Sequence, residues 1–202
     1  MGHPALDLTN KTAVAIGGTS GIGPTLAKGL ARAGANVVPT GRRADLVRAA
    51  AEEICKQHRR TMALTCDVTD RSTLESLRDT VCAELVTIAS LSSFVGLFEV
   101  AAYAASKSAV ASLTKSLAVE WARQGGCVNA IVPGVFRTDL TAPLLDITPR
   151  GQEFLLRTPM RRFGELEELV GAAVFLASDA ASFVTGHLLV VDGGFLASGV
   201  NQ

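Results

Sequence analysis

The sequence predicts an α/β fold in which a parallel sheet is covered by helices on both faces. Short apolar runs of strand length alternate with longer segments whose apolar residues recur every three or four positions. A glycine-rich turn stands between the first apolar run and the first helical segment. With 202 residues, the chain has the size of one domain with a sizeable core. We therefore expect residues 1–202 to form a single domain with a doubly wound parallel sheet.

The composition is that of an ordinary globular protein without a strongly charged surface. Lys and Arg number 19, as do Asp and Glu, so there is no positive excess for nucleic acid or an anionic membrane surface. No apolar run approaches a membrane span, and residues 1–11 lack the apolar core of a signal peptide. The 4 cysteines and 3 histidines are scattered, which indicates reduced thiols and no metal site. This composition favours a cytoplasmic enzyme or binding protein.

The first strand and the turn after it have the pattern of a phosphate-binding loop. Residues 12–16 form a short apolar run, typical of a strand buried on both faces. The sequence GGTSGIG follows at 17–23, and a helical pattern continues to Gly34. Glycines let the backbone approach a pyrophosphate closely, while a helix N-terminus supplies free N–H groups and a positive dipole. Pro24 fits the first turn of this helix, where a missing N–H costs nothing.

The second predicted strand, residues 36–40, is followed by Gly41, Arg42 and Arg43. In a dinucleotide-binding fold this position meets the adenosine ribose, where a carboxylate would bind the 2′-hydroxyl. No carboxylate stands here, and two guanidinium groups favour a 2′-phosphate instead. The alternative is that both arginines are solvated side chains at the start of the next helix, which is predicted at 44–58.

The segment between residues 62 and 89 departs from the regular alternation. A third strand is predicted at 62–66, and a helix with an apolar stripe begins after Asp70. That helix runs directly into the apolar run at 85–89, with no Gly, Pro or Asn between them. Connections from a helix to a strand normally need a few residues of their own. The sequence therefore indicates a seam near residues 83–86.

Ser90, Tyr103 and Lys107 have residue types and a spacing that suit acid–base catalysis. Tyr103 and Lys107 are four residues apart, so they lie on one face of a helix. An ammonium beside a phenol favours the phenolate, which makes Tyr103 a candidate general acid and base with Lys107 as its electrostatic partner. Ser90 follows an apolar run, and its hydroxyl can hydrogen-bond a substrate oxygen. The alternative is a surface Tyr and Lys on an alanine-rich helix.

The rest of the chain continues the alternation. Glycines at 125 and 126 stop the helix that holds Tyr103, and strands are predicted at 127–132 and 188–191. The connection at 135–164 contains three prolines and suits a short helical lid over a pocket, since such long connections are often functional. An amphipathic helix is predicted at 165–178.

Taken together, these motifs resemble the short-chain dehydrogenase/reductase family over nearly the whole chain. The resemblance implies a Rossmann-like fold and an NAD(P)-dependent oxidoreductase, with Ser90, Tyr103 and Lys107 as catalytic residues. In that family the Tyr exchanges a proton with the reacting oxygen, the Lys favours its ionised form and binds the nicotinamide ribose, and the Ser positions the substrate. The sequence VDGG at 191–194 matches the family's C-terminal signature.

The resemblance also places residues at the cofactor. With the two arginines argued above, the expected contacts are Gly17, Thr19, Ser20, Gly21, Ile22, Gly23, Arg42, Arg43, Asp67, Val68, Tyr103, Lys107, Pro133, Gly134, Val135 and Thr138.

The chain departs from the family pattern in one large feature. Ile16 replaces a common Thr, but the more serious loss is the Asn-Asn-Ala-Gly segment of the fourth strand and the helix after it, which carries a catalytic Asn. We expect a fold shortened by about one strand–helix unit, upwards of ~30 residues. If the sheet kept an empty position beside the first strand, where the missing strand belongs, buried backbone N–H and C=O groups would be left unpaired. We therefore predict that residues 86–89 pair with 13–16, in six strands ordered 3-2-1-4-5-6. This would displace the catalytic groups by one strand spacing, about 4.8 Å.

The expected function is NADP(H)-linked interconversion of a carbonyl and an alcohol, with NAD as the other possible cofactor. A weak likeness to sugar-acid and 3-oxoacyl reductases favours a small polar substrate. Its carboxylate would have these candidate ligands, unless they are merely solvated: Arg150, Arg157, Arg161 and Arg162. The alternative function is a catalytically weak or inactive member that binds a dinucleotide or forms oligomers. Family members pair through the helix at 101–124 or the strand near 191–193, so we expect a homo-dimer or tetramer.

Overall fold

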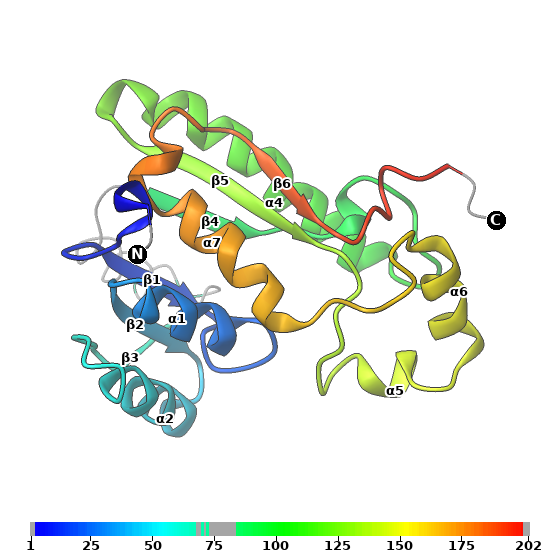
Figure 1. The fold of residues 1–202 in the computed structure, drawn as a ribbon, viewed down its shortest axis with the longest axis horizontal. Helices are drawn as coiled ribbons and strands as arrows, with labels where there is room; N and C mark the ends of the chain where they lie inside the picture. The colour runs from blue at the N-terminus through cyan, green and yellow to red at the C-terminus, as the bar shows by residue number, and fades with distance from the viewer. Residues whose placement is uncertain (1–2, 68–69, 71, 73–83, 200–202) are drawn as a thin grey trace. The chain divides into compact units, whose positions relative to one another are not determined.

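The computed structural model describes residues 3–67, 70, 72 and 84–199 of the chain. These residues fall into two compact units, whose elements are labelled in Figure 1. The first unit comprises Met1–Ala83 and Ala173–Ala180, and the second comprises Glu84–Ala172 and Ala181–Gln202. The single domain expected from the chain length stays a prediction.

The first unit is built on a three-stranded parallel sheet. Its elements are η1 (Pro4–Leu6), β1 (Thr12–Ile16), α1 (Gly23–Arg32), β2 (Asn36–Gly41), α2 (Ala44–Cys55) and β3 (Leu64–Thr65). The strand order is β1-β2-β3, with Val14 opposite Val38 and Thr40 opposite Leu64. The strands and the α-helices among these elements were predicted, whereas η1 was not. The strand β3 is shorter than the predicted 62–66, since only the last two residues of β2 pair with it.

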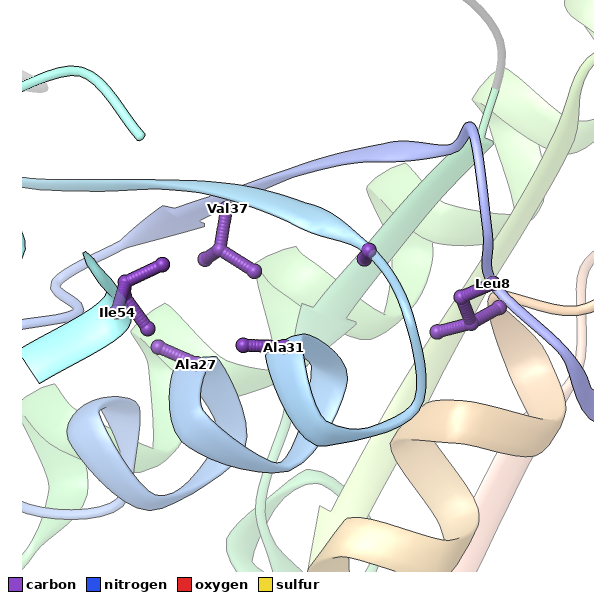
Figure 2. Packing of buried hydrophobic residues seen from close by; sticks show 6 residues of the cluster. Leu8, Ala27, Ala31, Val37 and Ile54 are labelled. Carbon is purple, nitrogen blue, oxygen red and sulfur yellow. The ribbon is translucent and has the colours of Figure 1, made fainter. Parts of the chain in front are cut away.

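Small and branched side chains form the core of the first unit. Val37 of β2 points toward Ala27 and Ala31 of α1 and toward Ile54 of α2, and Leu8 lies at one end of the cluster (Figure 2). The alanines leave room for α1 to lie close to the sheet, and burial of these side chains from water stabilises the unit. The glycine loop is therefore carried by a packed strand and a packed helix.

The second unit is built on a separate three-stranded parallel sheet. Its elements are β4 (Glu84–Ile88), η2 (Leu91–Ser93), α4 (Ala101–Trp121), η3 (Ala122–Gln124), β5 (Cys127–Pro133), α5 (Ala142–Leu145), α6 (Pro149–Arg157), η4 (Leu166–Leu169) and β6 (Leu188–Val191). The strand order is β4-β5-β6. Two further helices, α7 (Val170–Leu176) and η5 (Asp179–Ala181), span the boundaries between the units. The helix predicted at 165–178 begins as η4, where Glu165 and Glu168 form a capping box.

The central strand of the second unit is β5, which is buried along nearly its whole length. Its Asn129 is 1% exposed, and the side-chain amide donates a hydrogen bond to the Val184 carbonyl at 2.8 Å. The Asn129 Oδ1 accepts a hydrogen bond from the His187 N–H at 3.0 Å. A buried amide that satisfies two backbone groups fixes the approach of the chain to β6, because leaving either group unpaired would cost about 1–3 kcal/mol.

The strands of each unit pair among themselves. The described strands form two three-stranded sheets, β1-β2-β3 in the first unit and β4-β5-β6 in the second. The predicted pairing of residues 86–89 with 13–16 would join the two units, and it stays a prediction.

Two further expectations concern residues that the structure does not describe. The helix predicted after Asp70, and residue 83 of the predicted seam, lie outside the described residues. No described helix is long and apolar enough to cross a membrane. In the same part of the chain, no group of three His, Cys, Asp or Glu side chains is placed to hold a metal ion.

Candidate active site

Ser90 lies just beyond the carboxyl end of β4. The Ala89 N–H still donates to the Ile131 carbonyl of β5 at 2.8 Å, and Ser90 then continues in an extended conformation. The Ser90 hydroxyl oxygen caps η2 by accepting a hydrogen bond from the Ser92 N–H at 3.3 Å. Because the hydroxyl accepts this bond, its own proton remains available to a substrate oxygen.

Tyr103 and Lys107 lie in the first two turns of α4. The Lys107 Nζ is 5.8 Å from the centroid of the Tyr103 ring, which confirms that one helix face carries both side chains. The same Nζ donates a hydrogen bond to the Ile88 carbonyl, the last residue of β4, at 2.8 Å. This bond connects the helix of Tyr103 to the strand that ends at Ser90. Tyr103 is 49% exposed, so its phenol is accessible to a ligand.

Burial of the Lys107 ammonium lowers its pKa below the ordinary value of a lysine. The Ile88 carbonyl, a neutral acceptor, offsets only part of the lost hydration. An ammonium held in this half-buried position interacts with a nearby phenolate through a lower dielectric than bulk water provides. The ammonium of Lys107 therefore lies beside the Tyr103 ring in a half-buried position.

The segment that follows β5 begins at the same edge of the sheet as Ser90, since the parallel strands β4 and β5 both have their carboxyl ends there. The Gly134 N–H donates to the Val191 carbonyl at 2.8 Å, and a Cβ at Gly134 would lie 2.5 Å from the Asp192 Cα. Only glycine therefore fits this crossing. Thr138 is fixed by Thr141, whose Oγ1 accepts a hydrogen bond from the Thr138 N–H at 2.8 Å. The structure thus brings the predicted segment 133–138 to the edge that carries Ser90.

The glycine loop of the first unit has the close backbone packing that its sequence predicts. A Cβ at Gly23 would lie 2.1 Å from the Gly17 carbonyl oxygen, so this position excludes a side chain. Gly17 has a φ of +75°, which favours glycine. The Thr40 carbonyl accepts hydrogen bonds from the N–H groups of Gly17 and Gly18, at 3.0 and 3.1 Å. The loop is therefore held against the end of β2.

The predicted 2′-phosphate site lies at the start of α2. A Cβ at Gly41 would lie 2.8 Å from the Thr19 Oγ1, so the glycine loop and the β2–α2 turn meet closely. Arg42 and Arg43 are exposed, and within the described ranges neither guanidinium forms an ion pair. Asp67 is half-buried, whereas Val68 lies outside the described residues. The first unit thus holds the glycine loop and the two arginines, while the second holds Ser90, Tyr103, Lys107 and segment 133–138.

Two of the four arginines considered for a substrate carboxylate are engaged elsewhere. Arg162 forms two hydrogen bonds with the Glu168 carboxylate, at 2.6 and 2.7 Å, and this partner lowers the pKa of Glu168 to about 2. Arg150 pairs with Glu99 at 3.6 Å and donates to the Phe98 carbonyl. Arg150 therefore ties α6 to the loop between Ser90 and Tyr103. Sequence spacing carried no signal for either pairing.

A cavity of about 370 Å³, which the sequence did not predict, adjoins this loop. Its lining comes from Val95 to Leu97, from Leu156 and Arg157 at the end of α6, and from the C-terminal segment that includes Ser198. The rings of Phe154 and Phe195, 6.3 Å apart, join α6 to the C-terminal segment. The predicted helical segment at 135–164 thus contributes α6 to a cavity wall, while its action as a lid stays a prediction.

Comparison with known proteins extends the family resemblance. A protein-family model described as short chain dehydrogenase matches residues 11–85, and one described as Enoyl-(Acyl carrier protein) reductase matches residues 80–196. The chain is 33% identical, over 253 aligned positions, to a 2-dehydro-3-deoxy-D-gluconate 5-dehydrogenase of Bacillus subtilis (96% of this chain, 98% of the relative). It is 34% identical, over 258 positions, to a gluconate 5-dehydrogenase of Gluconobacter oxydans (98% and 100%).

A solved structure has the same fold. The gluconate 5-dehydrogenase of Burkholderia cenocepacia, crystallised with NADP and tartrate, superposes with a TM-score of 0.90 at 28% identity, over 96% of this chain and 98% of that one. The alignment to the Bacillus subtilis protein covers nearly all of both chains, yet its 253 positions exceed the 202 residues present here. This chain therefore lacks an internal segment that its relatives possess, and the two family models meet at residues 80–85.

The lowered pKa of Lys107 predicts a pH-dependent contribution to stability. Between that pKa and the unfolded value of ~10.4, the native protein has lost a proton that the unfolded chain keeps, so the free energy of unfolding rises with pH. We expect the unfolding free energy of the wild type, minus that of Lys107→Met, to increase with pH as the pH approaches ~10.4 in urea titrations. Lys115→Met, an exposed position on the same helix, should show no such trend. A difference that stays flat or falls would contradict the assignment.

Proposed function

The chain belongs to the short-chain dehydrogenase/reductase family, whose members are NAD(P)-dependent oxidoreductases, and we propose that it interconverts a carbonyl and an alcohol on a small sugar acid. The observation that carries this proposal is the contact of Lys107 with both Tyr103 and the end of β4. It supports a working proton-transfer group in a chain that has lost an internal segment.

The residues of the first unit fit a dinucleotide. The backbone approach of Gly23 to Gly17 leaves a surface free of side chains at the start of α1. Ile22, at the N-cap of α1, makes no side-chain hydrogen bond to the helix, so no side chain occupies the positive end of the helix dipole, where a pyrophosphate would bind. Arg42 and Arg43 would bind the 2′-phosphate of NADP, next to Thr19. When bound, the nicotinamide supplies or accepts the hydride.

The residues of the second unit supply acid–base chemistry. In the reductive direction Tyr103 donates its phenolic proton to the carbonyl oxygen, and in the oxidative direction its phenolate accepts the proton of the alcohol. Ser90 donates a hydrogen bond to the same oxygen. Lys107 stabilises the phenolate with its half-buried ammonium. Thr138 and segment 133–135 would bind the nicotinamide carboxamide, by resemblance to the family.

The proposed substrate class is a sugar acid. The cavity beside the loop that follows Ser90 has about 370 Å³ and combines apolar walls with Arg157 and Ser198. Arg157 lines this cavity and pairs with Glu153 through its Nε at 3.2 Å, so a substrate carboxylate would share this guanidinium with Glu153. The relatives support this class, since two are dehydrogenases of gluconate or a deoxygluconate and one was crystallised with tartrate.

The alternative function is a dinucleotide-binding member with little or no turnover. It is favoured by the missing internal segment, which in the family holds a catalytic Asn. The seam near residues 83–86 is supported by the meeting of the two family models at 80–85. A cytoplasmic location stays a prediction from the composition.

Turnover should distinguish the two functions. The wild type, incubated with NADPH and a keto sugar acid, should oxidise NADPH, as followed by loss of its absorbance. Tyr103→Phe, which keeps the ring but removes the acidic proton, should lower the rate by about 10²–10⁴-fold without weakening NADPH binding. The neutral keto sugar of equal length serves as the control for the carboxylate. NADPH binding without turnover of any carbonyl compound would favour the alternative.

Cofactor choice should depend on the arginines after β2. NADPH should bind more tightly than NADH by about one to two decades, because a charge-assisted contact to the extra phosphate is worth about 1.5–3 kcal/mol. Arg42→Ala and Arg43→Ala should weaken NADPH but not NADH, as measured by titrating the nicotinamide fluorescence. Arg48→Ala, an exposed arginine further along α2, is the matched control. Equal affinities for NADPH and NADH would contradict the assignment of Arg42 and Arg43 to the 2′-phosphate.

The chain should form a homo-oligomer. The contact through the C-terminal strand β6 should be retained better than the contact through the helix α4. Val119 of α4 is 80% exposed and Val190 of β6 is 38% exposed, so both surfaces present apolar area. A dimer or tetramer should appear by light scattering at micromolar concentration. Val190→Asp should dissociate it, whereas Val119→Asp should not, because the partner helix of α4 in the family belongs to the missing segment. A monomeric wild type would contradict this prediction.

A further inference from the structure

Ser93 is a hydroxyl outside the catalytic set that contacts the catalytic helix. It is the last residue of η2, the turn that Ser90 caps. Its Oγ donates a hydrogen bond to the main-chain carbonyl of Lys107 at 2.9 Å, in a part-buried position. Lys107 in turn donates from its Nζ to the Ile88 carbonyl at 2.8 Å. Lys107 is therefore bonded, through its backbone and its side chain, to both ends of the short segment that contains Ser90.

The start of α4 explains why this contact matters. Val100, at the N-cap, makes no side-chain hydrogen bond to the helix, and Tyr103 is only the third residue of α4. A helix N-terminus without a cap leaves its first N–H groups unpaired and frays readily. The position of Tyr103 therefore depends on contacts made one turn further along. The bond to Ser93 is such a contact, and it comes from the turn on which Ser90 lies.

The other serines nearby have different environments. The Ser92 side chain is buried, and its Oγ has no hydrogen-bond partner among the described residues. Ser106 donates to the Tyr103 carbonyl at 2.7 Å, which is a bond within α4 that connects it to no other element. Of these serines, Ser93 is the one whose hydroxyl joins the Ser90 turn to α4.

We propose that Ser93 is a positioning residue that sets the separation of the Ser90 hydroxyl and the Tyr103 phenol by bonding the Lys107 carbonyl. Its effect on turnover rests on the proposed function. Its effect on the start of α4 does not. Only a hydroxyl side chain can make this contact at the same backbone position, so threonine should replace serine and alanine should not.

The kinetic test compares Ser93→Ala with Ser93→Thr and with the matched control Ser106→Ala. Ser93→Ala should lower kcat about tenfold, equivalent to about 1.4 kcal/mol, because both catalytic groups must be aligned in the transition state. KM and the NADPH dissociation constant should stay within about twofold, since the residue contacts neither ligand. Ser93→Thr should recover most of kcat, and Ser106→Ala should resemble the wild type. A purely structural role would instead lower the folded fraction and leave kcat per folded molecule unchanged.

Hydrogen exchange tests the contact without turnover. In Ser93→Ala, the amides of residues 101–107 should exchange about tenfold faster than in the wild type, and Ser106→Ala should leave this segment unchanged. Unchanged exchange together with unchanged kcat in Ser93→Ala overturns the proposal. If the wild type binds NADPH but turns over no carbonyl compound, the proposed function fails. The exchange of 101–107 then decides the role of Ser93 by itself.

Discussion

The bond from the Lys107 ammonium to the Ile88 carbonyl is the constraint on which the candidate site depends. It holds the ammonium beside the Tyr103 ring and attaches the helix of Tyr103 to the strand that precedes Ser90. Half-burial of the ammonium strengthens its interaction with the phenol, but it disfavours the charged form and lowers the pKa of Lys107. A half-buried charged group with a shifted pKa, which costs folding free energy, is typical of an active site.

The supporting architecture divides the candidate cofactor residues between two packed units. The glycine loop rests on the carbonyl of Thr40, whereas Ser90 and segment 133–138 stand at the edge of the other sheet. Each half keeps the local geometry of its family: a close approach at Gly23 in one unit and a crossing that only glycine permits at Gly134 in the other. The loss of an internal segment has therefore left the local packing of both halves intact, because each has its own sheet and core.

Ion pairs arrange the connection after β5. Arg162 and Arg150 each pair with a glutamate, and the latter pairing holds α6 against the loop after Ser90. Arg157, which lines the cavity beside that loop, also pairs with a glutamate. The charged side chains of this segment therefore serve mainly to hold its own elements in place.

The sequence by itself determined the strands, the helices, the glycine loop and the Ser–Tyr–Lys spacing, because these depend on apolar periodicity and on neighbours within a few residues. Residues 12–16 and the helical face shared by Tyr103 and Lys107 are examples of this local information. Only the tertiary structure decided that Arg150 and Arg162 are paired and that Ser93 bonds the Lys107 carbonyl. Each of these depends on the free energy of contacts between distant residues, which no local pattern encodes.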